Sequence, residues 1–154
     1  SIALVHEVLY ETESGDGVSS KEYFKRFSSL IAESYACLGY SLPIEIDIQD
    51  RILGAERISY LGIVASQWIS ELYRRAGSGE GQARIRLSYR FSDIAEELVV
   101  CGGSALTDPE LRVARSLGME IAQALALRLG GTVRPTEGPG FCLCLRLPLD
   151  SQLR

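Results

Sequence analysis

The segment ARIRLSYRF, residues 83–91, alternates apolar and polar side chains without interruption. Ile85, Leu87, Tyr89 and Phe91 therefore fall on one face of an extended chain. Because successive side chains of a strand point to opposite faces, this pattern predicts a strand with one buried and one polar face. Such a strand belongs in a sheet that is covered on one side, which favours folds whose helices are gathered on that side.

Similar patterns predict the other elements. Helices are expected at residues 1–11, about 19–39, 58–76 and about 109–129, and strands at 41–47, 83–91, 97–101, 132–136 and 141–147. Residues 11–18 read as a polar loop, residues 51–57 as a connection and Ser92-Asp93 as a turn. This order predicts an α+β two-layer sandwich, with a mixed, mostly antiparallel sheet and about three helices on one face.

Helix ends and helix faces are also marked in the sequence. Ser19 or Ser20 is expected to cap the second helix, with Glu22 near the position of a capping box. Gly39 and the Gly130-Gly131 pair are expected to end the second and the last helix. Two helices carry apolar faces that predict the core: Tyr23, Phe24, Phe27, Leu30, Ile31 and Tyr35 on one, and Leu61, Val64, Ala65, Trp68, Leu72 and Tyr73 on the other.

The charge balance excludes some classes of partner. The chain has 154 residues, a formal net charge of −4 and no run of Lys or Arg. It is therefore expected not to bind nucleic acid, because neutralised phosphates supply most of that affinity. No apolar stretch reaches the roughly 18 residues that span a bilayer, so a cytoplasmic segment without membrane contact is expected. The chain opens at Ser1 inside a patterned helix, which indicates a piece of a longer protein.

Four cysteines are present, and they are expected to be reduced and buried as small apolar side chains: Cys37, Cys101, Cys142 and Cys144. Cys142 and Cys144 alternate on a predicted strand, so they face the same side and cannot easily bridge each other. A metal site would need Cys37, Cys101 or the only histidine, His6, to join them. No pair spacing typical of metal ligands supports such a site.

Three segments resemble a known family. SLGMEIAQALALRLGGTVRPTEGPGFCLCLRLPL, residues 116–149, resembles the last third of the ATPase-like catalytic domain of bacterial sensor histidine kinases. The likeness is to the HWE and type-2 branches, within the GHKL or Bergerat superfamily that includes gyrase and MutL. ALVHEVLY, residues 3–10, is similar to the end of their second dimerisation helix, and LGIVASQWISELYRRA, residues 61–76, stands where their magnesium-binding helix is expected.

The resemblance spans nearly the whole chain and implies both a fold and a chemistry. It divides the chain into the end of a dimerisation helix at 1–12, an ATPase-like domain at 13–150 and a tail at 151–154. In the family, a helix asparagine holds Mg²⁺, and an aspartate in an Asp-x-Gly-x-Gly loop accepts a hydrogen bond from adenine. A second Gly-x-Gly at the start of the last helix lets backbone N–H groups approach the phosphates.

This sequence departs from that pattern at each group. Ser66 and Glu71 stand where the helix asparagine is expected, and the chain contains no asparagine. Cys101, Gly102 and Gly103 stand where the adenine-binding acidic residue is expected, and Asp108 is followed by Pro-Glu. At the last helix, Ser116 replaces the first glycine and Gly118 keeps the second. These six positions, Ser66, Glu71, Gly102, Gly103, Ser116 and Gly118, are therefore interpreted as a degenerate nucleotide site.

Five residues have both a functional and a structural interpretation. Glu71 is a weak candidate Mg²⁺ ligand, but without the metal it would repel phosphates. Arg74 and Arg75 are expected to be cations at a helix C-terminus, not phosphate ligands. His6 matches the second dimerisation helix, whereas the phosphoacceptor of the family lies on the first, so a packing or capping role is expected. Trp68 is expected in the core under the sheet, where it would partly fill the adenine space.

The favoured hypothesis is a regulatory or docking module of a two-component signalling protein that binds neither ATP nor Mg²⁺. Its expected partners are a response regulator or the upstream dimerisation or sensor domain, and the full-length protein is expected to be a homodimer. The alternative is an active ATP-binding domain of a sensor histidine kinase that phosphorylates a histidine on an upstream helix. A partner-switching module of the anti-sigma type is a third hypothesis, which residues 3–10 argue against.

Overall fold

A five-stranded sheet forms one layer of the structure, a computed structural model that describes residues 2–76, 84–102, 117–136 and 141–149. Its strands are β3 (Ile44–Ile48), β5 (Ile85–Phe91), β6 (Ala95–Gly102), β7 (Thr132–Pro135) and β8 (Phe141–Pro148), in the spatial order β3-β5-β6-β8-β7. β3 runs parallel to β5, and every other neighbouring pair in this sheet is antiparallel. The predicted mixed, mostly antiparallel sheet is confirmed.

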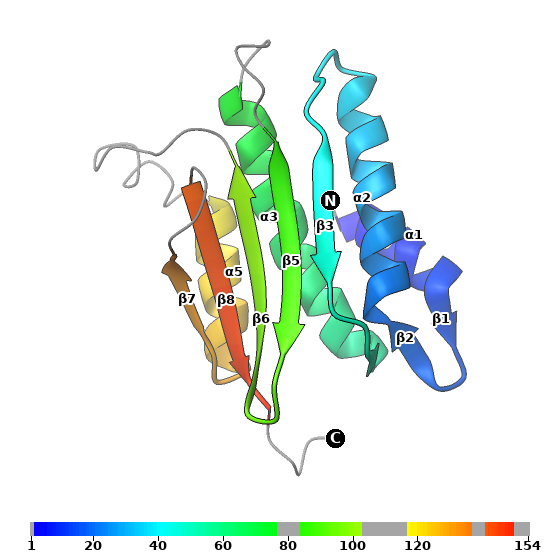
Figure 1. Ribbon diagram of the computed structural model, residues 1–154, viewed down its shortest axis with the longest axis vertical. Helices are drawn as coiled ribbons and strands as arrows, with labels where there is room; N and C mark the ends of the chain where they lie inside the picture. The colour runs from blue at the N-terminus through cyan, green and yellow to red at the C-terminus, as the bar shows by residue number, and fades with distance from the viewer. Residues whose placement is uncertain (1, 77–83, 103–116, 137–140, 150–154) are drawn as a thin grey trace.

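The helices form the second layer, behind one face of this sheet (Figure 1). α2 (Ser20–Ala36) packs on β3, α3 (Ala55–Ala76) packs on β5 and β6, and α5 (Leu117–Arg128) packs on β7 and β8. α1 (Ile2–Thr12) packs against α2 and α3 instead of the five-stranded sheet. The prediction of a two-layer α+β sandwich with three helices on one face is therefore confirmed.

A second, small sheet was not predicted. β1 (Glu13–Ser14) and β2 (Gly17–Ser19) form a hairpin in the predicted loop, and β4 (Ile52–Leu53) pairs with β2 in the predicted connection. Strands of two or three residues carry no side-chain period, so only the distant pairing reveals them. Gly17 has φ +123°, and a Cβ there would lie 2.7 Å from the carbonyl oxygen of Leu53, so the pairing requires glycine.

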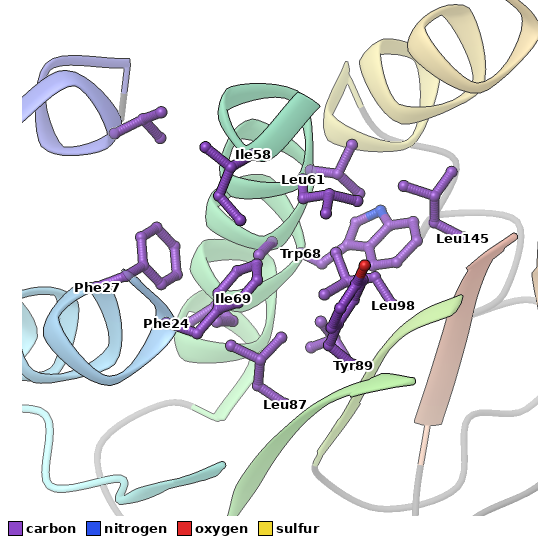
Figure 2. Close-up of a cluster of buried hydrophobic side chains, with 14 of the residues drawn as sticks. Phe24, Phe27, Ile58, Leu61, Trp68, Ile69, Leu87, Tyr89, Leu98 and Leu145 are labelled. Carbon is purple, nitrogen blue, oxygen red and sulfur yellow. The ribbon is translucent and has the colours of Figure 1, made fainter. Parts of the chain in front are cut away.

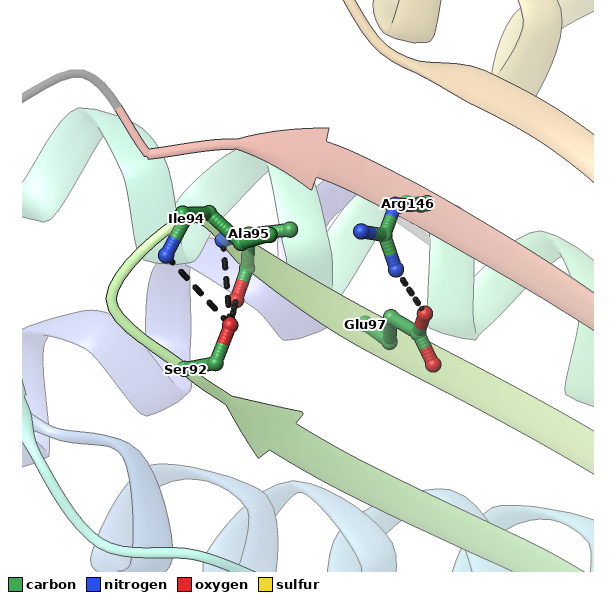
Figure 3. Close-up of polar contacts among 5 residues, drawn as sticks. All are labelled: Ser92, Ile94, Ala95, Glu97 and Arg146. Atoms are coloured by element: carbon green, nitrogen blue, oxygen red, sulfur yellow. Dashed lines mark hydrogen bonds and ion pairs between the residues drawn. The ribbon is translucent and has the colours of Figure 1, made fainter.

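The turn between β5 and β6 is held by one serine. The Ser92 N–H donates to the carbonyl of Ala95 at 2.8 Å, and Ser92 Oγ accepts from the N–H groups of Ile94 and Ala95, each at 3.3 Å (Figure 3). The predicted turn at Ser92-Asp93 is confirmed. β6 begins two residues before the predicted Glu97, because Glu96 points into the core and breaks the expected apolar pattern.

Three predicted helix ends lie within the described residues, and one of them is that of α2, which ends at Ala36 and is followed by Gly39 with φ +91°. Ser19 is the N-cap of α2, and its Oγ accepts from the N–H of Glu22 at 3.2 Å. α5 ends at Arg128 and is followed by Gly130, which has φ +75°, and the N–H of Gly131 donates to the carbonyl of Ala126 at 2.7 Å. The first part of the last predicted helix, residues 109–116, and the Gly138-Pro139-Gly140 turn lie outside the described residues.

The core lies between α3 and the sheet (Figure 2). α3 begins three residues before the predicted Ile58, and its predicted apolar face is buried throughout. The sheet contributes Ile85, Leu87, Tyr89, Leu98, Val100, Leu143, Leu145 and Leu147, all nearly inaccessible. Burial of this apolar surface is the main stabilising term of the fold.

Truncating a side chain at this interface is expected to destabilise the protein strongly. Leu61 is 1% exposed on α3, whereas Leu127 is 81% exposed on α5. Leu61→Ala should lower the free energy of unfolding by about 2–5 kcal/mol, because it removes packed atoms and leaves a cavity. Leu127→Ala, the same chemical change on the surface, should cost within about 0.5 kcal/mol. Urea unfolding measures both values, and equal losses would contradict the assignment of the core.

The N-terminus of α2 is also held by Asp50, which lies 31 positions from Ser19. Asp50 Oδ1 accepts from Ser19 Oγ at 2.7 Å and from the N–H of Lys21 at 3.3 Å. These hydrogen bonds, the one from Ser19 foremost, hold the pKa of Asp50 below its ordinary value. The carboxylate therefore favours the folded state only while it is ionised.

Asp50→Asn is expected to reduce the acid sensitivity of the fold. A carboxyl with a lowered folded pKa adds stability above its unfolded pKa, about 3.9, and loses it as the pH falls through the folded pKa. Between pH 5 and 3, the free energy of unfolding should therefore fall more steeply in the wild type than in Asp50→Asn. Thermal melts across this range give the two slopes, and parallel slopes would rule out this role for Asp50.

Candidate functional site

The predicted site positions that the structure describes lie toward one end of the sandwich. Ser66 and Glu71 lie on the second half of α3, Gly102 ends β6, and Gly118 lies in the first turn of α5. α3 packs against both β6 and α5, so the predicted positions on these three elements lie toward the same end of the sandwich (Figure 1). Gly103 and Ser116 lie outside the described residues.

Ser66 is one of the two positions, with Glu71, at which the resemblance predicts the metal-binding asparagine. Its side chain is 1% exposed and lies in the interior of the sandwich. A serine side chain is shorter than that of asparagine and lacks its amide oxygen, the group to which the resemblance assigns Mg²⁺. This position therefore offers Mg²⁺ a poor ligand.

Glu71, the candidate replacement ligand, is paired within its own helix. Its Oε2 lies 2.5 Å from Nη2 of Arg74, and the two side chains are 18% and 61% exposed. The pair joins residues i and i+3 of α3, where opposite charges attract. Arg74 thus compensates the carboxylate locally, and no group of three or more His, Cys, Asp or Glu side chains suited to a metal occurs among the described residues.

Gly102 is one of the three residues, with Cys101 and Gly103, at which the resemblance predicts an adenine-binding acidic residue. A Cβ at this position would lie 2.9 Å from Cδ1 of Leu72 and 3.4 Å from the carbonyl oxygen of Arg84. Leu72 itself is only 6% exposed. The end of β6 therefore packs directly against a leucine of α3 and presents no polar side chain on that face.

Trp68 lies in the core under the sheet, as predicted, and is 3% exposed (Figure 2). Its indole Nε1–H is buried and has no hydrogen-bond partner among the described residues. The ring lies near Leu98 and Leu145 of the sheet. The predicted filling of the adenine space by this ring stays a prediction.

Two cavities lie elsewhere, beside α2. One, of about 240 Å³, is lined by residues of α1, α2 and α3, among them Leu4, Tyr35 and Ser70. The other, about 580 Å³ and shallow, lies where α2 leads into β3, next to Gly39 and Pro43. Neither is lined by a predicted site residue.

The predicted state of the cysteines is wrong in two respects. Cys101 and Cys142 form a disulfide across β6 and β8, and Cys37 is exposed. Cys144 is a buried free thiol, as predicted, and burial raises its pKa. The alternation of apolar residues predicted the strands but not their register, and only the register places Cys101 opposite Cys142.

The predicted role of His6 is also wrong. His6 lies within the span of α1, away from either end, and its side chain is exposed. The buried side of this helix consists of Val5 and Val8. His6 therefore neither packs in the core nor caps the helix.

A buried polar cluster that the sequence did not predict lies at the opposite end of β6. Glu96 is 1% exposed, and both carboxylate oxygens are engaged: Oε2 accepts from the Tyr89 hydroxyl at 2.5 Å, and Oε1 accepts from Nε of Arg57. Arg57 also donates to the carbonyl of Pro148 at 3.1 Å. Burial, and then the Glu96 charge, raise the pKa of Tyr89. With its oxygens satisfied in this way, Glu96 joins α3 to the sheet and is not a free acid or base.

The cluster makes Tyr89→Phe a test of its structural role. Loss of a hydrogen bond to a buried carboxylate should lower the free energy of unfolding by about 1.5–3 kcal/mol. Tyr60→Phe is the matched control, because the Tyr60 hydroxyl donates to Glu56 at 2.9 Å on an exposed helix face. That change should cost no more than about 0.5 kcal/mol. Equal losses in the free energy of unfolding, measured with urea, would contradict a stabilising role for the Tyr89–Glu96 hydrogen bond.

Comparison with known proteins defines the fold further. No family model and no curated protein matches the sequence. The structure matches the histidine kinase domain of the Erythrobacter litoralis EL346 blue-light activated histidine kinase with a TM-score of 0.74 and 16% identity, over 97% of this chain and 71% of that one. It also matches the ATP binding domain of PrrB from Mycobacterium tuberculosis with a TM-score of 0.56 and 19% identity, over 80% and 92% of the two chains.

These matches show that the chain has the histidine-kinase ATPase-like fold. A longer chain of the EL346 kinase matches with a TM-score of 0.78 and 17% identity, over 98% of this chain and 54% of that one. The chain thus spans about half the length of that kinase chain. None of the helices in the described part is long and apolar enough to cross a membrane.

Proposed function

We propose that the chain is a degenerate ATPase-like domain of a two-component signalling protein, and that it serves as a regulatory or docking module without binding ATP. The fold is that of histidine kinase ATPase domains. The observation that carries the proposal is the contact at Gly102. Where the resembling family presents an acceptor to adenine, this chain has a glycine packed against Leu72.

The metal side of the site supports the same proposal. The chain contains no asparagine, Ser66 is buried, and Glu71 is paired with Arg74. The residues present therefore do not fit a magnesium-bound triphosphate, since both the metal ligand and the purine acceptor are replaced. A buried charge-assisted hydrogen bond is worth about 1.5–3 kcal/mol, so losing the acceptor alone weakens purine binding about tenfold or more.

The alternative proposal is an active ATP-binding domain of a sensor histidine kinase. One observation favours it: the Glu71 carboxylate lies on the helix that carries the metal ligand in the resembling family, and carboxylates bind Mg²⁺ well. The alternative requires Glu71 to leave Arg74 and to bind the cation. It can therefore be tested by substituting Glu71 alone.

The proposed partners are a response regulator or an upstream dimerisation or sensor domain of the same protein, within a homodimer. α1 supports this, because its outer side exposes large apolar residues: Ile2 is 59% exposed and Tyr10 is 89% exposed. Leu38, at the end of α2, is 72% exposed. These exposed apolar side chains are available for contact with another protein segment.

Thermal unfolding with and without Mg·ATP tests the proposal. A ligand present at 100 times its Kd adds about 2.7 kcal/mol, which is roughly 5–10 °C for a domain of this size. At millimolar Mg·ATP we expect a shift below about 1 °C. One of the solved ATP-binding domains of the same fold serves as the positive control and should shift upward.

A clear upward shift of this chain would overturn the proposal and favour the alternative. In that case Glu71→Gln tests whether the Glu71 carboxylate binds the magnesium ion. If Glu71 binds the cation, the magnesium-dependent part of the shift should disappear in this variant. Arg74→Ala, which removes the Arg74 partner of the carboxylate, is the matched control and should preserve or increase the shift.

A further inference from the structure

The disulfide between Cys101 and Cys142 lies at the end of a long ladder. β6 and β8 pair over eight positions, from Ala95 opposite Pro148 to Gly102 opposite Phe141. Cys101 and Cys142 form the next-to-last pair, and their Cα atoms are 4.1 Å apart. That separation is near the roughly 4.5 Å of a non-hydrogen-bonded antiparallel pair, in which the side chains are closest.

The strands hold the two sulfurs together whether or not the bond exists. Six of the eight pairs lie on the inner side of the two cysteines, and Leu98, Leu143 and Leu145 anchor these strands in the core. The fold therefore does not require the bond to bring the strands together. Two thiols kept opposite each other in this way have a high effective concentration and oxidise readily to an intramolecular disulfide.

The position also gives a reagent a route to the pair. Only the last pair, Gly102 with Phe141, lies beyond the cysteines, so opening the end of the ladder exposes them without global unfolding. Cys101 is 6% exposed and Cys142 is 2% exposed, so the Cys101 thiol is the more accessible of the two to a reagent.

The other two cysteines are poorly placed to form a disulfide with Cys101 or Cys142. Cys144 is on the same face of β8, two residues further into the ladder, and lies opposite Val99. It is 2% exposed, and burial raises its pKa, which lowers its thiolate fraction. Cys37 is exposed at the C-cap of α2, an element that packs on β3, at the far edge of the sheet from β8.

We infer that Cys101 and Cys142 are a reversible thiol–disulfide modification site that controls the stability of this end of the sheet. The oxidant is a small disulfide such as glutathione disulfide. The Cys101 thiolate attacks it, its S–S bond breaks, and one glutathione leaves and takes up the proton. The Cys142 thiolate then attacks Cys101 Sγ in the mixed disulfide, forming the protein S–S bond and releasing the second glutathione. Two protein thiols are oxidised and one small disulfide is reduced to two thiols.

Oxidation links the end of β6 to the start of β8. Gly102, which packs against Leu72 of α3, directly follows Cys101, so the bond steadies the same end of the sandwich that carries the predicted nucleotide-site positions. The inference rests on the strand register and does not require the proposed function. A domain that binds ATP and one that does not would both respond to this bond.

The test equilibrates the folded chain in glutathione buffers of graded ratio and then alkylates free thiols. Peptide mass spectrometry should show residues 101 and 142 passing together between two free thiols and one disulfide, and reduction should reverse it without denaturant. The Cys37→Ser variant excludes disulfides between molecules. Cys144→Ser, the matched control on the same strand face, should leave this titration unchanged.

Hydrogen exchange then measures the effect on the sheet. Amides of residues 100–102 and 141–143 should exchange more slowly in the oxidised protein, whereas those around the Glu97–Arg146 ion pair should not change (Figure 3). The melting temperature should rise by roughly 5–10 °C on oxidation. Any of three results would overturn the inference: no bond in excess glutathione disulfide, a bond to Cys144 instead, or equal exchange in the two states.

Discussion

The burial of α3 against β5 and β6 is the contact on which the rest of the structure depends. α3 lies in the middle of the helical layer, with α1, α2 and α5 all packed against it. A helix with neighbours on several sides needs apolar or small residues on more than one face, and α3 provides both. Gly62 is one of them: a Cβ there would lie 2.2 Å from the Tyr23 hydroxyl, so the buried Tyr23 side chain of α2 packs against α3 at a position without a Cβ.

The two ends of the sandwich differ in the polar contacts of their buried and half-buried side chains. At one end, Glu96 is buried, and Tyr89 and Arg57 satisfy its carboxylate. Toward the other end, where the resemblance predicts the nucleotide-site positions, Gly102 packs against Leu72, and Glu71 is paired with Arg74. A fold is kept by its core and its structural polar contacts, whereas a binding site requires particular groups, so the first can persist when the second changes.

The outer face of the sheet follows the alternation of its strands. No described helix covers it, and it carries cross-strand ion pairs, including Arg84 with Glu45, Arg90 with Asp47 and Arg146 with Glu97. Such pairs keep an exposed sheet face soluble at little cost in stability. The three cysteines of β6 and β8 share this face, which explains how a disulfide forms outside the apolar core.

The sequence by itself determined what depends on neighbouring residues. The period of apolar side chains gave α2, α3, β5 and the β7–β8 hairpin, and Ser19 and Gly130 marked helix ends, because these signals act within one or two turns. A resemblance, not a period, located Ser66, Glu71 and Gly102. Only the tertiary structure decided the remaining features. These are the strands β1, β2 and β4, the hydrogen bond that Ser19 donates to Asp50, the partners of Glu96 and the Cys101–Cys142 bond. Each depends on which distant residues face each other, and that register is set by packing the whole core and not by any local preference.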